Sequence, residues 1–174
     1  PRSTPARPGA MPVRAAPHKE PGVQAIDHEA SLPQAGEALK LLQDLKRDWD
    51  PILRAREFVV KRLAEMCCCG RDGRWSHAVG GYCMPAGDGK TSRQISLRLR
   101  QPRSHTLEPY DSLMKTMAHE IAHIVHGKHS AKFYALIDEL LNQQATFKDT
   151  GRVLDAQGFP VEGGRALSAE AHNP

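Results

Sequence analysis

Four of the nine histidines lie within eleven positions, in the segment MAHEIAHIVHGKHSAKF at residues 117–133. On a helix that advances 100° per residue, His119 and His123 stand one turn apart on one face, so both imidazoles can bind one zinc ion. Glu120 follows the first of them and projects beside the ion, where its carboxylate can take a proton from water. This HExxH pattern predicts a zinc site of the kind that hydrolyses peptide bonds.

A zinc site with one open position needs a third protein ligand, and two histidines follow the motif. His126 shares a face with His119 but would lie about 10.5 Å further along the helix axis, too far for one ion. His129 is better placed, because Gly127 can adopt the left-handed conformation that ends a helix and lets the chain turn back. We therefore predict one Zn²⁺ bound by His119, His123 and His129. His126 then either orients substrate or an oxyanion, or is an ordinary histidine at the end of the helix.

Apolar residues at helical spacing predict three helices around these side chains. The first covers residues 38–52, and Pro51 is expected to end or kink it. The second covers 111–126, with a buried stripe opposite the histidines formed by Met114, Met117, Ile121 and Val125. The third covers 130–144 and turns inward Phe133, Leu136, Ile137, Leu140 and Leu141.

Two segments predict strands, EFVVKRLAEM at residues 57–66 and QISLRLR at 94–100. The second alternates strictly and buries one face made of Ile95, Leu97 and Leu99. It is expected to border the substrate cleft, because a substrate chain can add to such a sheet as a further strand. Residues 67–92, which contain six glycines, are expected to form a loop.

The other face of the 94–100 strand is basic. It carries Arg98 and Arg100, with Lys90 and Arg93 nearby, and could follow the phosphate backbone of DNA. A solvated basic edge without a ligand explains the same pattern. The formal net charge of +4 fits a polyanionic partner but does not require one.

At 174 residues the chain suits one domain with tails. Residues 1–33, rich in Pro, Ala and Arg, predict a disordered basic tail, followed by a domain over 34–167 and a C-terminal tail over 168–174. No apolar run is long enough to cross a membrane and no signal peptide is evident. We expect an intracellular protein, nuclear or cytoplasmic, without a membrane partner. The initial proline fits a fragment of a longer chain.

The four cysteines are too few and too clustered for a disulfide framework. A second zinc site built from Cys67, Cys69, His77 and Cys83 is conceivable. A switch in which one of these thiolates caps the catalytic metal is a further hypothesis. Reduced thiols on a loop or at a strand end are expected in preference to either.

The motif H-E-x-x-H-x-x-H-G-x-H-x-x-x-F-Y, with ISLRLR and PYDSLMK before it, resembles the WLM domain, a group of zinc proteases related to the SprT/Spartan type. The resemblance extends from about residue 35 to 167 and implies a zincin-like α+β fold, with the HExxH helix and flanking helices packed on a small mixed or antiparallel sheet. It also implies three histidine ligands and Glu120 as the catalytic acid/base. Ile124 and Lys128 replace the Asn and Pro that the family often has, which concerns loop stiffness and substrate preference. A metzincin is disfavoured, because no methionine follows Met117.

Proteins trapped covalently on DNA are the substrates of this family, and DNA activates it. The resemblance therefore implies a DNA-binding zinc endopeptidase that degrades DNA-bound or DNA-crosslinked proteins in DNA repair. Family tails often recruit ubiquitin-like modifiers or a segregase ATPase, and residues 159–167 resemble such a docking segment. Two other classes stay open, a zinc peptidase acting on free polypeptides without DNA and a non-catalytic module that uses zinc for stability. The intact Glu120 speaks against the second.

Overall fold

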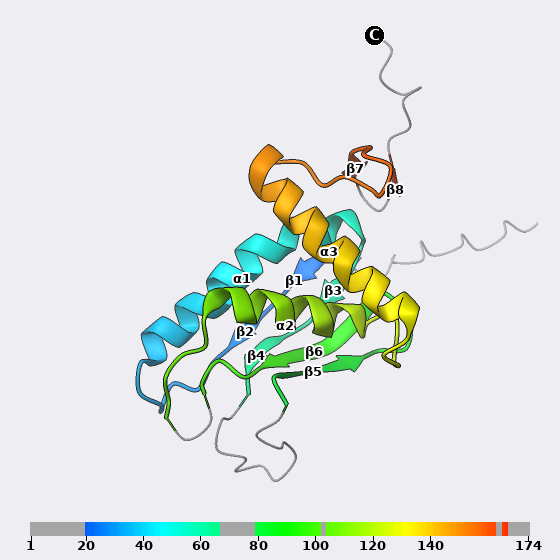
Figure 1. Cartoon of the computed structure of the whole chain (residues 1–174). Helices are drawn as coiled ribbons and strands as arrows, with labels where there is room; N and C mark the ends of the chain where they lie inside the picture. The colour runs from blue at the N-terminus through cyan, green and yellow to red at the C-terminus, as the bar shows by residue number, and fades with distance from the viewer. Residues whose placement is uncertain (1–19, 67–78, 102–103, 163–164, 167–174) are drawn as a thin grey trace, which may run out of the picture.

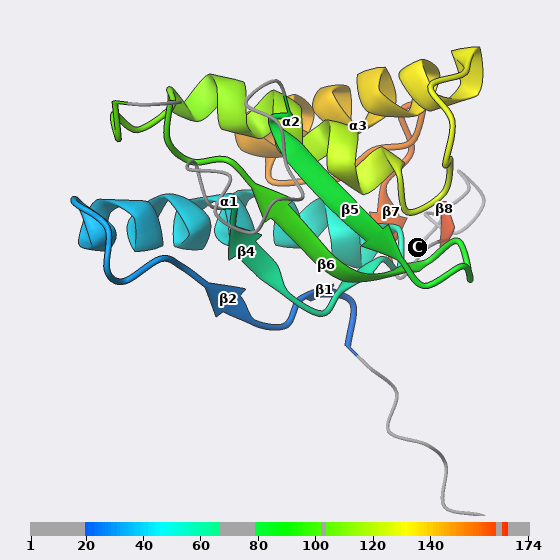
Figure 2. The same ribbon diagram turned by 90° about the horizontal axis from the view of Figure 1, so that it is seen from below.

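The computed structural model describes residues 20–66, 79–101, 104–162 and 165–166. One mixed sheet contains β1 (Gly22–Val23), β2 (Ile26–Asp27), β3 (Val59–Val60), β4 (Leu63–Glu65), β5 (Gly81–Pro85) and β6 (Thr91–Leu97). The helices α1 (Ala35–Ala55), α2 (Tyr110–Ala122) and α3 (Ala131–Thr150) lie on one side of it (Figures 1 and 2). A short antiparallel pair follows, β7 (Val161–Glu162) and β8 (Arg165–Ala166). The expected α+β fold is confirmed.

The sheet is parallel except at one edge. β1 and β2 pair with β3 and β4, which both pair with β6, and all these pairings are parallel. β5 pairs antiparallel with the other side of β6 and has no further strand beside it among the described residues. The strand expected to border a cleft, β6, is therefore an inner strand, and β5 lies at the edge of the sheet on that side among the described residues.

The core lies between the sheet and the helices, and its largest contributor is α1. The predicted stripe of this helix is completely buried, with 0 % exposure at Ala38, Leu42, Leu45, Trp49 and Ile52. Pro51 does not end the helix, which continues to Ala55. Burial of Ile52 and Leu53 favours this continuation over the backbone hydrogen bond that proline removes.

Two predictions about irregular segments are wrong. Part of the predicted disordered tail forms β1 and β2, and part of the predicted 67–92 loop forms β5 and the start of β6. Strands of two residues, such as β1 and β2, are too short to show an alternating pattern in the sequence. They are recognised only by their contacts with distant segments. The backbone N–H of Val23 donates to Asp50 Oδ1 at 2.8 Å, and Lys46 Nζ donates to the Val23 carbonyl at 2.6 Å. Residues 20–33 are thus part of the domain.

The remaining predicted segments are adjusted at their ends. The 57–66 strand is split into β3 and β4, and the third predicted helix runs six residues further, to Thr150. None of the helices in the described ranges is long and apolar enough to cross a membrane.

Candidate metal centre

The second helix ends inside the histidine motif. α2 carries His119 and Glu120, stops at Ala122, and has His123 as its C-cap residue. The prediction of a helix to residue 126 is wrong, and Val125 is 42 % exposed instead of buried. The chain then turns back, and α3 begins after Ser130, whose hydroxyl accepts a hydrogen bond from the Phe133 N–H. This early end allows a residue six positions after His123 to reach the face of α2.

Three imidazoles meet at this turn. The Nε2 atom of His129 lies 3.2 Å from Nε2 of His119 and 3.1 Å from Nε2 of His123. The three candidate ligand atoms all lie within 4.8 Å of one another. A tetrahedral zinc ion with Zn–N bonds of 2.0–2.1 Å places its nitrogen ligands roughly 3.3 Å apart, so the two distances to His129 fit. In the described part of the chain, no other group of His, Cys, Asp or Glu side chains is arranged to hold a metal.

Neighbouring groups favour the protonation states in which His119 and His123 can bind a metal. The ring Nδ1 of His123 lies 2.9 Å from the carbonyl oxygen of His126. A proton on Nδ1 is donated to that oxygen, which leaves Nε2 with a free lone pair. Burial, followed by the charges of the two other imidazoles, lowers the pKa of His119 and favours its neutral form, the one that binds metal.

Phe133 forms the inner wall of the cluster. Its ring centroid lies 4.8, 4.6 and 4.8 Å from the ring centroids of His119, His123 and His129, and its side chain is 0 % exposed. The three imidazoles therefore rest on one buried aromatic ring. Their other side faces outward, since His129 is exposed.

Glu120 is buried between α2 and the start of β5. Its side chain is 4 % exposed, and this burial raises the pKa of Glu120 to about 7. A Cβ atom added to Gly81 would lie 2.8 Å from Oε1 of Glu120 and 3.0 Å from Cγ2 of Thr116. The strand can approach the carboxylate this closely because residue 81 has no side chain. Nothing local in the sequence distinguishes Gly81 from the other glycines of its segment.

The chain turns back toward α2 without a left-handed conformation at Gly127. This residue has no positive φ, and a Cβ there would meet no atom within 4 Å. The predicted left-handed helix end is therefore wrong, and the short helix α2 achieves the turn instead. His126 contributes its backbone carbonyl to the site, as described above.

The cysteine hypotheses are only partly covered by the structure. Cys67, Cys69 and His77 lie outside the described residues. Cys83 is buried on β5, with Sγ 3.4 Å from the Ser92 hydroxyl oxygen, and burial raises the pKa of this thiol to about 11. A buried, protonated thiol is a poor metal ligand, which speaks against a switch role for Cys83.

The basic face predicted for residues 94–100 is largely covered. Arg100 is 1 % exposed; its Nε donates to Glu65 Oε1 at 2.7 Å, and Nη1 donates to the Pro33 carbonyl. The prediction that Arg100 contacts DNA is therefore wrong. Arg98 is held by Glu108 and by the Val79 carbonyl. The alternation assigned the right faces but could not show which segments cover them.

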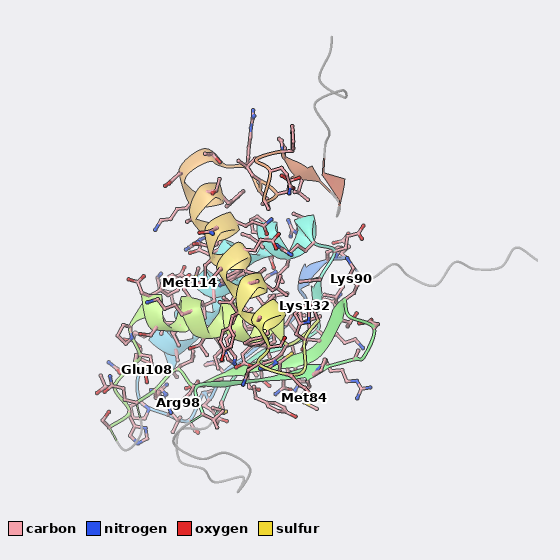
Figure 3. The ribbon with its side chains drawn as sticks, turned by 45° about the vertical axis from the view of Figure 1, so that its right-hand side comes forward. Met84, Lys90, Arg98, Glu108, Met114 and Lys132 are labelled. Atoms are coloured by element: carbon pink, nitrogen blue, oxygen red, sulfur yellow. The ribbon has the colours of Figure 1, made fainter. Side chains whose placement is uncertain are left out.

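The two other predicted contacts differ in how they are held. Lys90 Nζ donates to the Arg56 carbonyl at 2.8 Å. Arg93 is exposed. The labelled Lys90 and Arg98 lie far apart in Figure 3, so these cations do not form one compact patch.

Comparisons with known proteins identify the family of this chain. A family model of the WLM domain matches residues 21–174. The DNA-dependent metalloprotease WSS1 of Saccharomyces cerevisiae is 31 % identical over 136 residues, which are 78 % of this chain and 46 % of the relative. WSS1 homolog 2 of Schizosaccharomyces pombe is 27 % identical over 113 residues, 64 % of this chain and 38 % of the relative. The chain thus spans less than half the length of these curated relatives.

The fold comparison gives the same result. A crystal structure of Wss1 from Saccharomyces cerevisiae matches with a TM-score of 0.62 and 27 % identity, over 78 % of this chain and 98 % of that one. A Wss1 structure from Schizosaccharomyces pombe matches with a TM-score of 0.55. Because the family model covers most of the sequence and the fold agrees, this chain belongs to the WLM domain family.

Proposed function

We propose that this chain is the catalytic domain of a zinc-dependent endopeptidase that degrades DNA-bound or DNA-crosslinked proteins in DNA repair. The observation that carries the proposal is the convergence of three imidazole nitrogens, together with the buried carboxylate of Glu120, which follows His119 on α2. The relatives named above are DNA-dependent metalloproteases, which supports both the chemistry and the dependence on DNA.

His119, His123 and His129 would hold the zinc ion. When bound, zinc acidifies water and polarises the scissile carbonyl. Glu120 accepts a proton from the attacking water and later delivers it to the leaving amine. Burial keeps bulk water away from this proton.

Protein chains are the proposed substrates and DNA the proposed activator. Exposed Arg93 and the more constrained Lys90 are the remaining candidates for phosphate contacts. Recruitment of ubiquitin-like modifiers or a segregase ATPase through the tails, and action in the nucleus or cytoplasm, belong to the same proposal. The burial of Arg100 removes one candidate phosphate contact, and a peptidase that acts on free polypeptides without DNA is the alternative that the test below distinguishes.

The test uses the zinc-loaded protein, Glu120→Gln, and the matched control Glu37→Gln, which changes an exposed glutamate of α1. A basic DNA-binding protein is incubated with each, with and without single- or double-stranded DNA. We expect cleavage by the wild type and Glu37→Gln, stimulated by DNA and lost on chelation. Glu120→Gln should retain one zinc per chain and cleave nothing. Cleavage by Glu120→Gln would refute the catalytic assignment, and cleavage indifferent to DNA would support the DNA-independent peptidase.

Phosphate contacts are tested separately by binding at several salt concentrations. Arg93→Ala should weaken DNA binding and lower the slope of log affinity against log salt by about one unit. An unchanged slope would remove Arg93 from the DNA-binding surface.

A further inference from the structure

The turn between α2 and α3 carries two lysines next to a candidate metal ligand. Lys128 directly precedes His129, and Lys132 follows it by three residues, in the first turn of α3. All three residues are exposed. Figure 3 shows Lys132 at the end of α3 where the chain arrives from α2. Two positive charges therefore lie beside the outward-facing member of the three-histidine cluster.

No carboxylate in the described part of the chain neutralises these two charges. Neither lysine side chain takes part in an ion pair or a hydrogen bond. An exposed lysine on a helix is often balanced by an acid three or four residues away, but none of the residues at these spacings from Lys132 is acidic. No Asp or Glu lies between Glu120 and Asp138 in the sequence, and Glu120 is buried. Both ammonium groups are thus available to an incoming anion.

The backbone that carries the two lysines is held in place. The Ser130 N–H donates to the Lys128 carbonyl at 2.8 Å, and the Ser130 hydroxyl accepts from the Phe133 N–H at 3.4 Å. Phe133 is completely buried against the imidazoles. A Cβ added to Gly127 would meet no atom within 4 Å, so the space beside the turn is open. The lysines therefore start from a fixed backbone, and only their stems adjust.

The reach of the two ammonium groups limits which part of a substrate they can contact. A lysine ammonium group extends roughly 6 Å from its Cα atom, and consecutive Cα atoms are about 3.8 Å apart. The charge of Lys128 thus lies within about 10 Å of the Cα atom of His129. An extended chain advances about 3.3 Å per residue, so this distance corresponds to about three residues of a bound polypeptide.

A carboxylate of a polypeptide suits these charges better than a nucleic-acid backbone. Phosphate contacts along a strand need a series of cations. After Lys132, no Lys or Arg follows in the sequence until Lys148. The next charged residues of α3 are Asp138 and Glu139, which would repel a row of phosphates. A single acidic side chain needs only the two lysines.

We propose that Lys128 and Lys132 select substrates that carry an acidic side chain within about three residues of the scissile bond. The carboxylate pairs with one or both ammonium groups while the neighbouring peptide bond lies at the metal centre. An exposed ion pair of this kind discriminates by up to about fivefold, and salt weakens it. This inference rests on the proposed peptidase function and specifies its substrates.

The test compares the cleavage-site preferences of the zinc-loaded wild type, Lys128→Glu and Lys132→Glu. The substrates are a peptide library with acetylated and amidated ends, so that only side chains carry charge, and the products are read by mass spectrometry. For the wild type, kcat/KM should be about fivefold higher with Asp or Glu than with Asn or Gln near the scissile bond. Each charge reversal should transfer the preference to Lys or Arg, which a structural role would not produce. High salt should remove the preference but not the cleavage of neutral peptides.

Two kinds of control accompany the charge reversals. Lys148→Glu makes the same change at an exposed position in the last turn of α3 and should keep the wild-type preference. Lys128→Gln and Lys132→Gln remove a charge without introducing a carboxylate that could bind the metal. They should weaken the preference without inverting it. Bound zinc and folded protein are measured for every variant, so that a loss of the site is recognised as such.

Binding provides a second measurement that does not need turnover. A fluorescent peptide with one acidic residue should bind Glu120→Gln about fivefold more tightly than its amide counterpart, and the added pair Lys128→Gln and Lys132→Gln should abolish this difference. If the wild type cleaves nothing but the difference persists, the peptidase proposal fails and the lysine proposal stands. Cleavage without a charge preference would overturn the lysine proposal. So would charge reversals that weaken binding of a single-stranded oligonucleotide and leave the peptide preference unchanged, because the lysines would then be phosphate contacts.

Discussion

Replacing Gly81 with alanine tests whether β5 positions the catalytic carboxylate. The added Cβ would lie 2.8 Å from Oε1 and 2.9 Å from Cγ of Glu120. An ordinary contact is about 3.5 Å, so the carboxylate or the strand must move by roughly 0.7 Å. A displacement of this order at a reacting group costs roughly 10- to 100-fold in rate. We expect kcat to fall by that factor, with KM nearly unchanged and one zinc ion still bound.

Gly80→Ala is the matched control for this substitution. A Cβ at Gly80 would lie 3.6 Å from Cγ2 of Thr116, an ordinary contact, so its kcat should stay within about twofold of the wild type. Neither glycine has a positive φ, and alanine is compatible with both backbones. Single-turnover cleavage, bound zinc and urea unfolding are measured together. Wild-type kcat in Gly81→Ala would refute the argument, and so would a loss of activity matched by a loss of zinc or of folded protein.

Three further substitutions test the packing and charge of the domain. Arg100→Met leaves Glu65 charged and buried, so it should destabilise the fold by about 3–5 kcal/mol in urea unfolding, whereas the exposed control Arg93→Met should change stability by less than about 0.5 kcal/mol. Phe133→Leu should weaken zinc binding about tenfold or more in a chelator competition, because all three imidazoles lose their common support; unchanged affinity would exclude this role. In metal-free protein, the pKa of Glu120 rises from 4.5 to about 7 on folding, so the folded state retains a proton that the unfolded chain releases and stability falls as pH rises through this window. At pH 8, metal-free Glu120→Gln should therefore be about 3 kcal/mol more stable than the wild type, and equal stabilities would contradict the burial argument.

Local patterns predicted the parts of the site that lie on regular helices. The spacing of His119 and His123, and the stripe of α1, follow from a helical repeat that needs no tertiary information. The start of α3 at Ser130 is also a local feature, because the hydroxyl caps the first turn. The choice of His129 over His126 agrees with the observed cluster, although the reason given through Gly127 does not.

The remaining features depend on contacts between distant segments. Alternation marked Arg100 as outward-facing, but the chain before α1 and the side chain of Glu65 enclose it. Val125 has the spacing of a core residue, yet the helix must end before it for the third histidine to return. Gly81 acquires its role only when β5 meets α2. In each case the residue type can be read from the sequence, but its neighbours depend on contacts that only the fold reveals.

The edge of the sheet at β1 is covered by hydrogen bonds to side chains of α1. At β1, Gly22 and Gln24 donate to β3, and the outward groups of Val23 are already bonded to Asp50 and Lys46 of α1. The strand of a second copy would thus find no free backbone groups at Val23 with which to pair. Growth into a fibre by edge stacking requires a receptive row at both margins. Asp50 and Lys46 of α1 thus close this part of the margin to the edge-to-edge pairing from which fibres grow.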